Sequence, residues 1–368
     1  MENQLIPKLR FPQFEDRLGQ IKLGDICTIK TGKKDTQNRI EDGKYPFYVR
    51  SNTIERINSY SFDGEAILTS GDGVGVGKNF HYIDGKFDYH QRVYALHSFD
   101  KSFHGKFIYQ IFKEKFYKRV MRLSAKNSVD SVRMDMISSM PISFPTLPEQ
   151  QKIASFLTAV DTKITQLTKK KALLEQYKKG VMQKIFKQEI RFKDDNGNNY
   201  PNWETKKLGE ISFKKSSNIS ANNLDENTGD FIIYGASGVL KKIDFYREEE
   251  PYISIVKDGA GVGRVFICEP KTSVLGTMDI INIKEGNNLY FIYSILQRIY
   301  FVKYTTGSTI PHIYFKDYSK EKINVPCLKE QTKIANFLRA IDKKTALVNT
   351  QLNTTKTFKK GLLQQLFV

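Results

Sequence analysis

The sequence has few cysteines and no long apolar run. Its 368 residues, 40% of them hydrophobic, include only three cysteines, Cys27, Cys268 and Cys327, which lie far apart without metal-ligand spacing. Sparse thiols favour a reducing, cytoplasmic setting, and the first residues lack the basic-then-apolar pattern of a secretory signal. No run of about 18 or more apolar residues occurs, as a transmembrane helix would need. We therefore expect a soluble protein of two or three domains.

Catalytic motifs are also missing. No His-Glu-x-x-His pair and no Gly-x-Ser-x-Gly elbow is present. The Pro-Pro-Tyr or Pro-Pro-Phe of an amino-methyltransferase and the Pro-Asp step of a common nuclease core are absent too. We therefore expect no catalytic residue and no metal site on this chain. The five histidines show no close metal spacing: His81, His90, His97, His104 and His312.

Two glycine-rich loops, residues 72–78 and 258–264, resemble nucleotide-binding loops only superficially. The first lacks the Walker spacing, because Asp72 stands where glycine is needed and Asn79 follows Lys78. One interpretation is a tight turn that needs positive φ angles. The other is a loop whose backbone approaches DNA, with Lys78 and Arg264 directed at phosphate or base edges. An enzyme that binds nucleotide here is a further alternative, which saturable nucleotide binding would favour.

The chain is strongly basic, with a formal net charge of +18. A protein of this charge most often meets a polyanion, and nucleic acid is the leading candidate because phosphate neutralisation supplies much of the affinity. An anionic membrane surface is less favoured, since the lysines do not gather into one polybasic cluster. Many lysines could also simply be solvated.

One stretch of sequence occurs twice. Residues 147–161 return as residues 328–342, shifted by 181 positions, and Lys178-Lys179-Gly180 returns as Lys359-Lys360-Gly361 with the same shift. A fixed period is typical of a repeated structural unit, which here is about half of the protein.

Each copy is predicted to form a long amphipathic helix of about 35 to 40 residues, roughly 55 Å. Eight of ten heptad positions from Ile153 are aliphatic, and Thr146 to Glu149 reads as a capping box. Gly180 and Gly361 could bend these helices or end them early. The aliphatic residues form a narrow stripe along each helix, which favours pairing of the two copies with each other. Two ordinary core helices, each within its own domain, remain an alternative. The predicted helix-pairing residues are Ile153, Leu157, Val160, Ile164, Leu167, Leu174, Ile334, Leu338, Ile341, Val348, Leu352 and Leu362.

The blocks before each helix, residues 1–146 and 190–327, share an order of short strands and some helix, which predicts two similar α+β domains. Residues 72–78 return as residues 258–264, now shifted by 186, so the loops differ in length. In the first block we expect strands at 23–29, 45–52, 65–69 and 92–96, and a helix within 103–122.

The sequence resembles the specificity subunit of type I restriction-modification enzymes over its whole length. The resemblance rests on Leu147-Pro148-Glu149-Gln150-x-Lys152-Ile153-Ala154-x-Phe156-Leu157 with downstream Asp161, and on the echo from Leu328. Gly307-Ser308-Thr309 also resembles the family's second-domain ending. The resemblance implies a first target-recognition domain at 1–146, a spacer helix at 147–189, a second such domain at 190–327 and a second helix at 328–368.

The resemblance implies further that each domain reads one half of a bipartite DNA target. The helices would pair as an antiparallel coiled coil with a pseudo-twofold repeat and set the spacing. Two modification subunits, carrying adenine methyltransferase and S-adenosylmethionine, would dock on the helical region. Restriction subunits with ATP- and Mg-dependent translocase and nuclease would join them. This chain would hold no cofactor and contact no membrane.

Candidate DNA contacts follow from loop position and residue type. Arginine, asparagine and glutamine can bridge base edges, whereas lysine usually holds phosphate. Because the two domains differ in these loops, we expect an asymmetric target. The candidates are Arg50, Asn52, Lys78, Asn79, Gln91, Arg92, Lys241, Lys242, Lys257, Arg264, Ser308 and His312.

Two non-enzymatic alternatives remain. A coiled-coil adaptor could use basic faces to bind protein or RNA, and binding that ignores DNA sequence would favour it. A solitary specificity-type protein could also lack active partners, which one sequence does not reveal.

Overall fold

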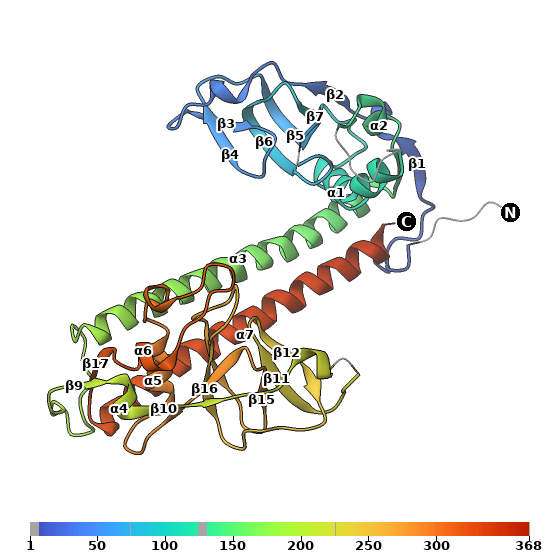
Figure 1. Ribbon diagram of the computed structural model, residues 1–368. Coiled ribbons are helices and arrows are strands. Elements are labelled where there is room, and N and C mark those ends of the chain that lie inside the picture. The colour runs from blue at the N-terminus through green and yellow to red at the C-terminus, as the bar shows by residue number, and fades with distance from the viewer. Residues whose placement is uncertain (1–6, 74, 124–130, 225, 368) are drawn as a thin grey trace. The chain divides into compact units, whose positions relative to one another are not determined.

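The structure is a computed structural model that describes residues 7–73, 75–123, 131–224 and 226–367 (Figure 1). It divides into two compact units: residues 1–169 with 349–368, and residues 170–348. Each unit holds one α+β domain and a portion of both long helices, α3 (Leu147–Phe186) and α7 (Leu328–Leu366).

The first unit is built on one six-stranded sheet. Its elements are β1 (Gly19–Lys22), β2 (Thr28–Thr31), β3 (Tyr45–Tyr48), β4 (Ile54–Ile57), β5 (Phe62–Ser70), β6 (Phe80–Tyr89), β7 (Val93–His97), α1 (Gly105–Leu123), α2 (Met134–Ser138) and β8 (Pro141–Phe144). The sheet order is β2-β7-β5-β6-β3-β4, and only β3 and β6 pair in parallel. Strands β1 and β8 form a separate antiparallel ribbon.

Helix α1 closes the core of this unit. Its apolar residues recur at helical spacing, and Phe107, Ile111 and Phe116 are buried against strand residues such as Ile67. The same cluster contains Leu157 from α3, and also Ile153, Leu362 and Leu366 from the two long helices. One end of the helix pair is therefore part of the domain's own core.

The second unit repeats this order of elements. Its elements are β9 (Glu204–Lys207), α4 (Leu208–Ile211), β10 (Ser212–Ser216), β11 (Phe231–Gly235), β12 (Gly238–Ile243), β13 (Tyr252–Val256), β14 (Val265–Cys268), β15 (Ser273–Val274), β16 (Met278–Ile283), α5 (Leu289–Leu296), α6 (Phe315–Tyr318) and β17 (Lys322–Val325). The order β10-β16-β13-β14 matches β2-β7-β5-β6, and β9 with β17 matches β1 with β8. The predicted α+β class and internal repeat are confirmed.

The core of the second unit also includes both long helices. Phe291 of α5 is fully buried in a cluster that contains Ile185 of α3 and Ile334 of α7. Helix α5 begins at a well-made cap, because the Asn288 side chain accepts hydrogen bonds from the backbone N–H groups of Tyr290 and Phe291.

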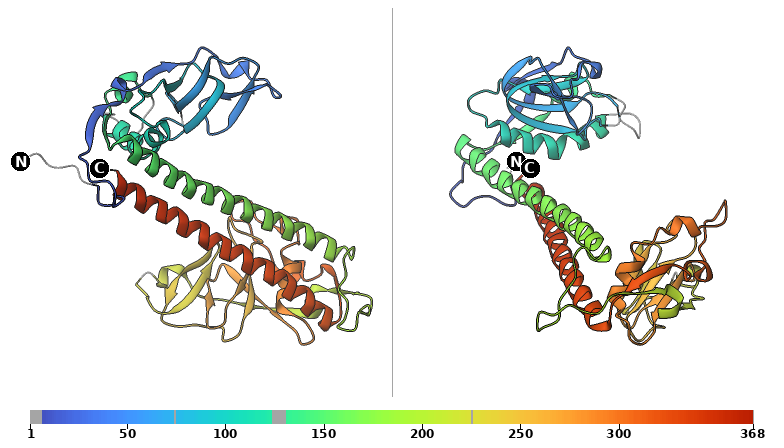
Figure 2. Two further views of the ribbon diagram at one scale, coloured as in Figure 1. Left: turned by 180° about the vertical axis from the view of Figure 1, so that it is seen from behind. Right: turned by 90° about the vertical axis from the view of Figure 1, so that its left-hand side faces the viewer.

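The long helices have 40 and 39 residues and run without interruption through Gly180 and Gly361, so neither glycine ends its helix. Within each unit they lie side by side (Figure 2) and run antiparallel, since Asp161 meets Lys359 in the first and Lys178 meets Asp342 in the second. No helix in the described part of the chain has both the length and the apolar character to cross a membrane. Of the predicted helix-pairing residues, nine are buried and three are half-buried: Val160, Ile164 and Leu174.

The Glu-Gln pair at the start of each long helix ties the helix to its domain. Gln150 Oε1 accepts a hydrogen bond from the backbone N–H of His104 (3.0 Å), next to the start of α1. Gln331 Oε1 accepts the equivalent bond from Asn288 (2.8 Å), the cap of α5. The repeated motif is therefore used for attachment between helix and domain.

One predicted strand is wrong at its start. Residues Leu23–Asp25 form a short 3-10 helix, and the strand begins only at Thr28. Leu23 is fully buried and its backbone N–H bonds to Met140 O (3.0 Å), so the fold uses this apolar residue as a turn anchor.

Candidate nucleic-acid interface

The glycine loop of the first unit joins β5 to β6 and is a tight turn. Gly73 and Gly77 have φ of +80° and +63°, a region that favours glycine. A Cβ on Gly77 would also lie 2.9 Å from Tyr117 Cδ2. The base of the loop is held by the Val132 N–H, which donates to Gly71 O (2.7 Å).

Two arginines converge on the aspartate that begins this loop. Arg50 Nη1 lies 3.0 Å from Asp72 Oδ1, and Arg92 Nε lies 3.6 Å from Oδ2. Their side chains are 45% and 66% exposed. Asp72 therefore orients two guanidinium groups that still present free donors to solvent, as contacts to phosphate or guanine require.

Asn79 differs from the other candidates of the first domain. It is buried, and its Nδ2 donates to Arg50 O (3.1 Å) and Ser70 Oγ (3.3 Å). Its side chain thus holds the loop in shape and does not line the outer surface.

The remaining candidates of this domain are exposed. Lys78 Nζ lies 5.6 Å from the centre of the Tyr117 ring. Gln91 Nε2 donates to Asp35 Oδ2 (3.0 Å), and Asn52 follows the end of β3. The structure brings Arg50, Lys78 and Arg92 to one loop, and their charges exceed that of its aspartate.

The second unit builds the same loop between β13 and β14. Gly259 and Gly263 have φ of +87° and +83°, and a Cβ on Gly263 would lie 2.6 Å from Phe301 Cβ. The Ile313 N–H donates to Lys257 O (3.0 Å), which repeats the bond of Val132 to Gly71 in the first unit.

The side chains around the aspartate of this second loop are different. His312 Nδ1 lies 2.8 Å from Asp258 Oδ1, and Lys257 Nζ lies 3.8 Å from Oδ2. Arg264 is exposed and donates from Nη1 to Ala236 O (3.2 Å). The same backbone frame thus carries two arginines on Asp72 in one copy and a histidine with a lysine on Asp258 in the other.

The last three candidates lie outside the loop itself. Lys241 and Lys242 belong to β12, where Lys241 is half-buried with Nζ donating to Leu224 O (2.5 Å) and Lys242 is exposed. Ser308 is exposed on the segment that precedes His312.

Sequence reasoning missed the two aspartates. A choice of arginine, asparagine, glutamine and lysine by residue type leaves out Asp72 and Asp258, although both copies of the loop begin with this residue. Its presence in both copies was the available signal.

Two histidines near the first loop, the half-buried His81 and the buried His90, have lowered pKa values. Burial lowers the pKa of His81, whose Nε2 lies 2.9 Å from Ser51 O. Burial, assisted by Arg50, also lowers the pKa of His90, whose Nδ1 accepts a hydrogen bond from the Arg92 N–H (2.9 Å). Both rings are therefore neutral near pH 7.

Metal chemistry has no candidate site in the described residues: no three histidine, cysteine, aspartate or glutamate side chains there are placed to hold an ion.

Comparison with known proteins decides the family. Residues 17–176 and 200–356 match the model of the type I restriction modification DNA specificity domain. The chain belongs to this family. Two matched segments mean two specificity domains, and the function class is DNA recognition in restriction-modification.

Similar type I specificity subunits come from several bacteria. The specificity subunit of the type I restriction enzyme EcoDI of Escherichia coli is 21% identical, over 94% of this chain and 86% of the relative. A putative type I specificity subunit of Mycoplasma pneumoniae is 26% identical, over 86% of this chain and 87% of the relative. The crystal structure of the type I S subunit from M. genitalium matches with a TM-score of 0.77 at 18% identity, covering 99% of each chain, and so shares the fold.

Proposed function

We propose that this chain is the non-catalytic subunit that selects the DNA target of a type I restriction-modification system. Each domain reads one half of an asymmetric bipartite target. The paired helices fix the number of base pairs between the halves.

The observation that carries this proposal is the pair of glycine loops. They share backbone, glycine conformation and a leading aspartate, yet Arg50 and Arg92 surround one, and Lys257 and His312 the other. A common frame with different side chains suits two sites that do the same task on different sequences.

Docking of two modification subunits on the helices is supported by a repeated exposed aromatic residue. Tyr177 of α3 and Phe358 of α7 are separated by the repeat of 181 positions, and each is 53% exposed. Exposed aromatics are typical anchors of protein interfaces. One such residue on each helix offers two equivalent positions to two copies of one partner.

The chemistry belongs to the partners under this proposal. The modification subunits bind S-adenosylmethionine and methylate adenine, and restriction subunits use ATP and Mg for translocation and cleavage. The assembly acts on double-stranded DNA in the cytoplasm, without a membrane and without a cofactor on this chain.

The test is methylation of a random DNA library by this chain together with the modification subunits of its source cell. Sequencing of methyladenine is expected to return one two-part motif with unlike halves. An exchange of residues 1–146 for the first domain of another specificity subunit is expected to change one half only. Methylation without sequence preference would contradict the proposal and favour the adaptor alternative.

A further inference from the structure

Two lysines occupy heptad positions of the helix seam where apolar residues are expected. The side chains of Lys178 and Lys359 are only 16% and 11% exposed. They are the same residue of the repeat, 181 positions apart.

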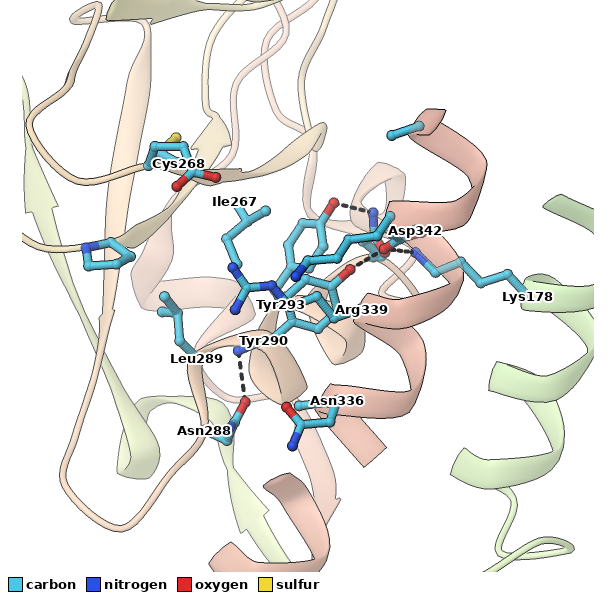
Figure 3. Close-up of a pocket in the computed structure, with 16 residues that line it drawn as sticks. Lys178, Ile267, Cys268, Asn288, Leu289, Tyr290, Tyr293, Asn336, Arg339 and Asp342 are labelled. Atoms are coloured by element: carbon cyan, nitrogen blue, oxygen red, sulfur yellow. Dashed lines mark hydrogen bonds and ion pairs between the residues drawn. The ribbon is translucent and has the colours of Figure 1, made fainter. Parts of the chain in front are cut away.

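Each lysine meets an aspartate of the other long helix. Lys359 Nζ lies 2.6 and 2.7 Å from the two carboxylate oxygens of Asp161. Lys178 Nζ lies 2.7 Å from Asp342 Oδ2, as Figure 3 shows. The aspartates are also repeat equivalents, so one pair of sequence positions produces both ion pairs.

Each aspartate is also held by a helix of its own recognition domain. Gln110 Nε2 of α1 donates to Asp161 Oδ2 (3.2 Å). The hydroxyl of Tyr290 on α5 donates to Asp342, beside a groove of about 650 Å³ (Figure 3). Each carboxylate thus connects α3, α7 and the domain at one point.

These ion pairs are poorly suited to adding stability. Removing a pair from water costs about as much as its attraction returns. Burial lowers the pKa of Lys359 despite the attraction of Asp161, so the charged ammonium carries a net cost.

The pairs are well suited to fixing register. If the helices slid by one heptad, Asp161 would face Leu352 or Leu366 in place of Lys359. The ammonium of Lys359, whose side chain is only 11% exposed, would lose its carboxylate, which is strongly unfavourable, whereas leucines alone would tolerate the slide. Both ion pairs therefore form together only in the observed register.

We propose that Asp161 and Asp342, with their lysines, are positioning residues that fix the register of α3 against α7 and the attachment of each domain. They thereby determine the gap between half-sites. This inference rests on the proposed function.

The test replaces both lysines by methionine, in K178M/K359M, which keeps the seam apolar. The melting temperature is expected to fall, because Asp161 and Asp342 lose their lysine partners. The methylated library is expected to show two or more gap lengths that differ by about 10 Å of DNA, roughly three base pairs. The matched control is K179M/K360M, which removes the same charges from exposed neighbouring positions and is expected to keep one gap.

The single variant D161K is expected to give several gap lengths in the methylated library. The charge exchange D161K/K359D is expected to restore one gap length. A second readout needs no DNA. Spin labels at positions 163 and 356, exposed and on opposite helices, are expected to give one distance in the wild type and additional distances in K178M/K359M.

One gap and one spin-label distance in K178M/K359M would overturn the inference, because the pairs would then only stabilise the protein. A wild-type chain that directs no two-part motif would instead contradict the proposed function, and the spin-label distances would still decide the register.

Discussion

Arg10 holds both carboxylate oxygens of Glu149, with Nε 2.9 Å from Oε1 and Nη2 2.7 Å from Oε2. The sequence suggested a capping box for Glu149, but the described contacts of its side chain are to Arg10. Arg191 holds Glu330 in the same way, at 3.2 and 2.7 Å. The first residues of each domain are therefore clamped to the first turn of the long helix that follows that domain.

Removal of Arg10 alone is expected to be costly. Arg10→Met leaves Glu149, whose side chain is 1% exposed, without a partner, so we expect a loss of roughly 3–5 kcal/mol in the free energy of unfolding. Urea unfolding measures this loss. The double change R10M/E149M serves as the control and is expected to regain most of it; equal losses in both variants would contradict the account.

The glycines of the loops are expected to differ in cost. Gly73→Ala meets only an unfavourable φ, since nothing lies within 4 Å, and should cost about 1 kcal/mol. Gly77→Ala adds a collision with Tyr117 and should cost more. In the second domain Gly263→Ala should lower the stability more than Gly259→Ala for the same reason. Thermal unfolding of the four variants tests this order, and equal losses within each pair would refute it.

Arg92 is expected to affect one half-site only. Arg92→Ala should weaken binding of the full target by about 1–3 kcal/mol and relax positions in the half read by the first domain. Fluorescence anisotropy with variant targets measures both effects. Arg39→Ala removes an exposed arginine paired with Glu55 (3.7 Å) and serves as control. A loss of base specificity in the other half-site would show that the first domain does not read the half assigned to it.

Acid is expected to destabilise the protein through His90. Its pKa is lowered in the folded state, so the unfolded chain takes up the proton first. The contribution of His90 to the free energy of unfolding is complete above about pH 6.5. It is lost as the pH falls through that value toward the folded-state pKa, with a slope of up to about 1.4 kcal/mol per pH unit. His90→Asn keeps an acceptor for the Arg92 N–H and should flatten the acid limb of the stability curve. Identical slopes would show that His90 does not titrate on unfolding.

The long helices could be predicted from sequence because their heptad period is local and occurs twice. The loop frame was also recognisable, since glycines with positive φ have few substitutes. The structural role of Asn79 could not be predicted, because its side chain bonds to the backbone carbonyl of Arg50, 29 residues away in the sequence, as well as to Ser70. For the same reason Leu23 was assigned to a strand, although the distant Met140 makes it a turn anchor.

The spacing of the half-sites tests the central claim most directly. One heptad is inserted into each long helix, after residues 169 and 350, which preserves the seam and adds about 10 Å to each helix. Methyladenine sequencing is predicted to return both half-sites unchanged, with a gap longer by roughly three base pairs. Unchanged half-sites at the original gap would contradict the claim that the helix pair determines the distance.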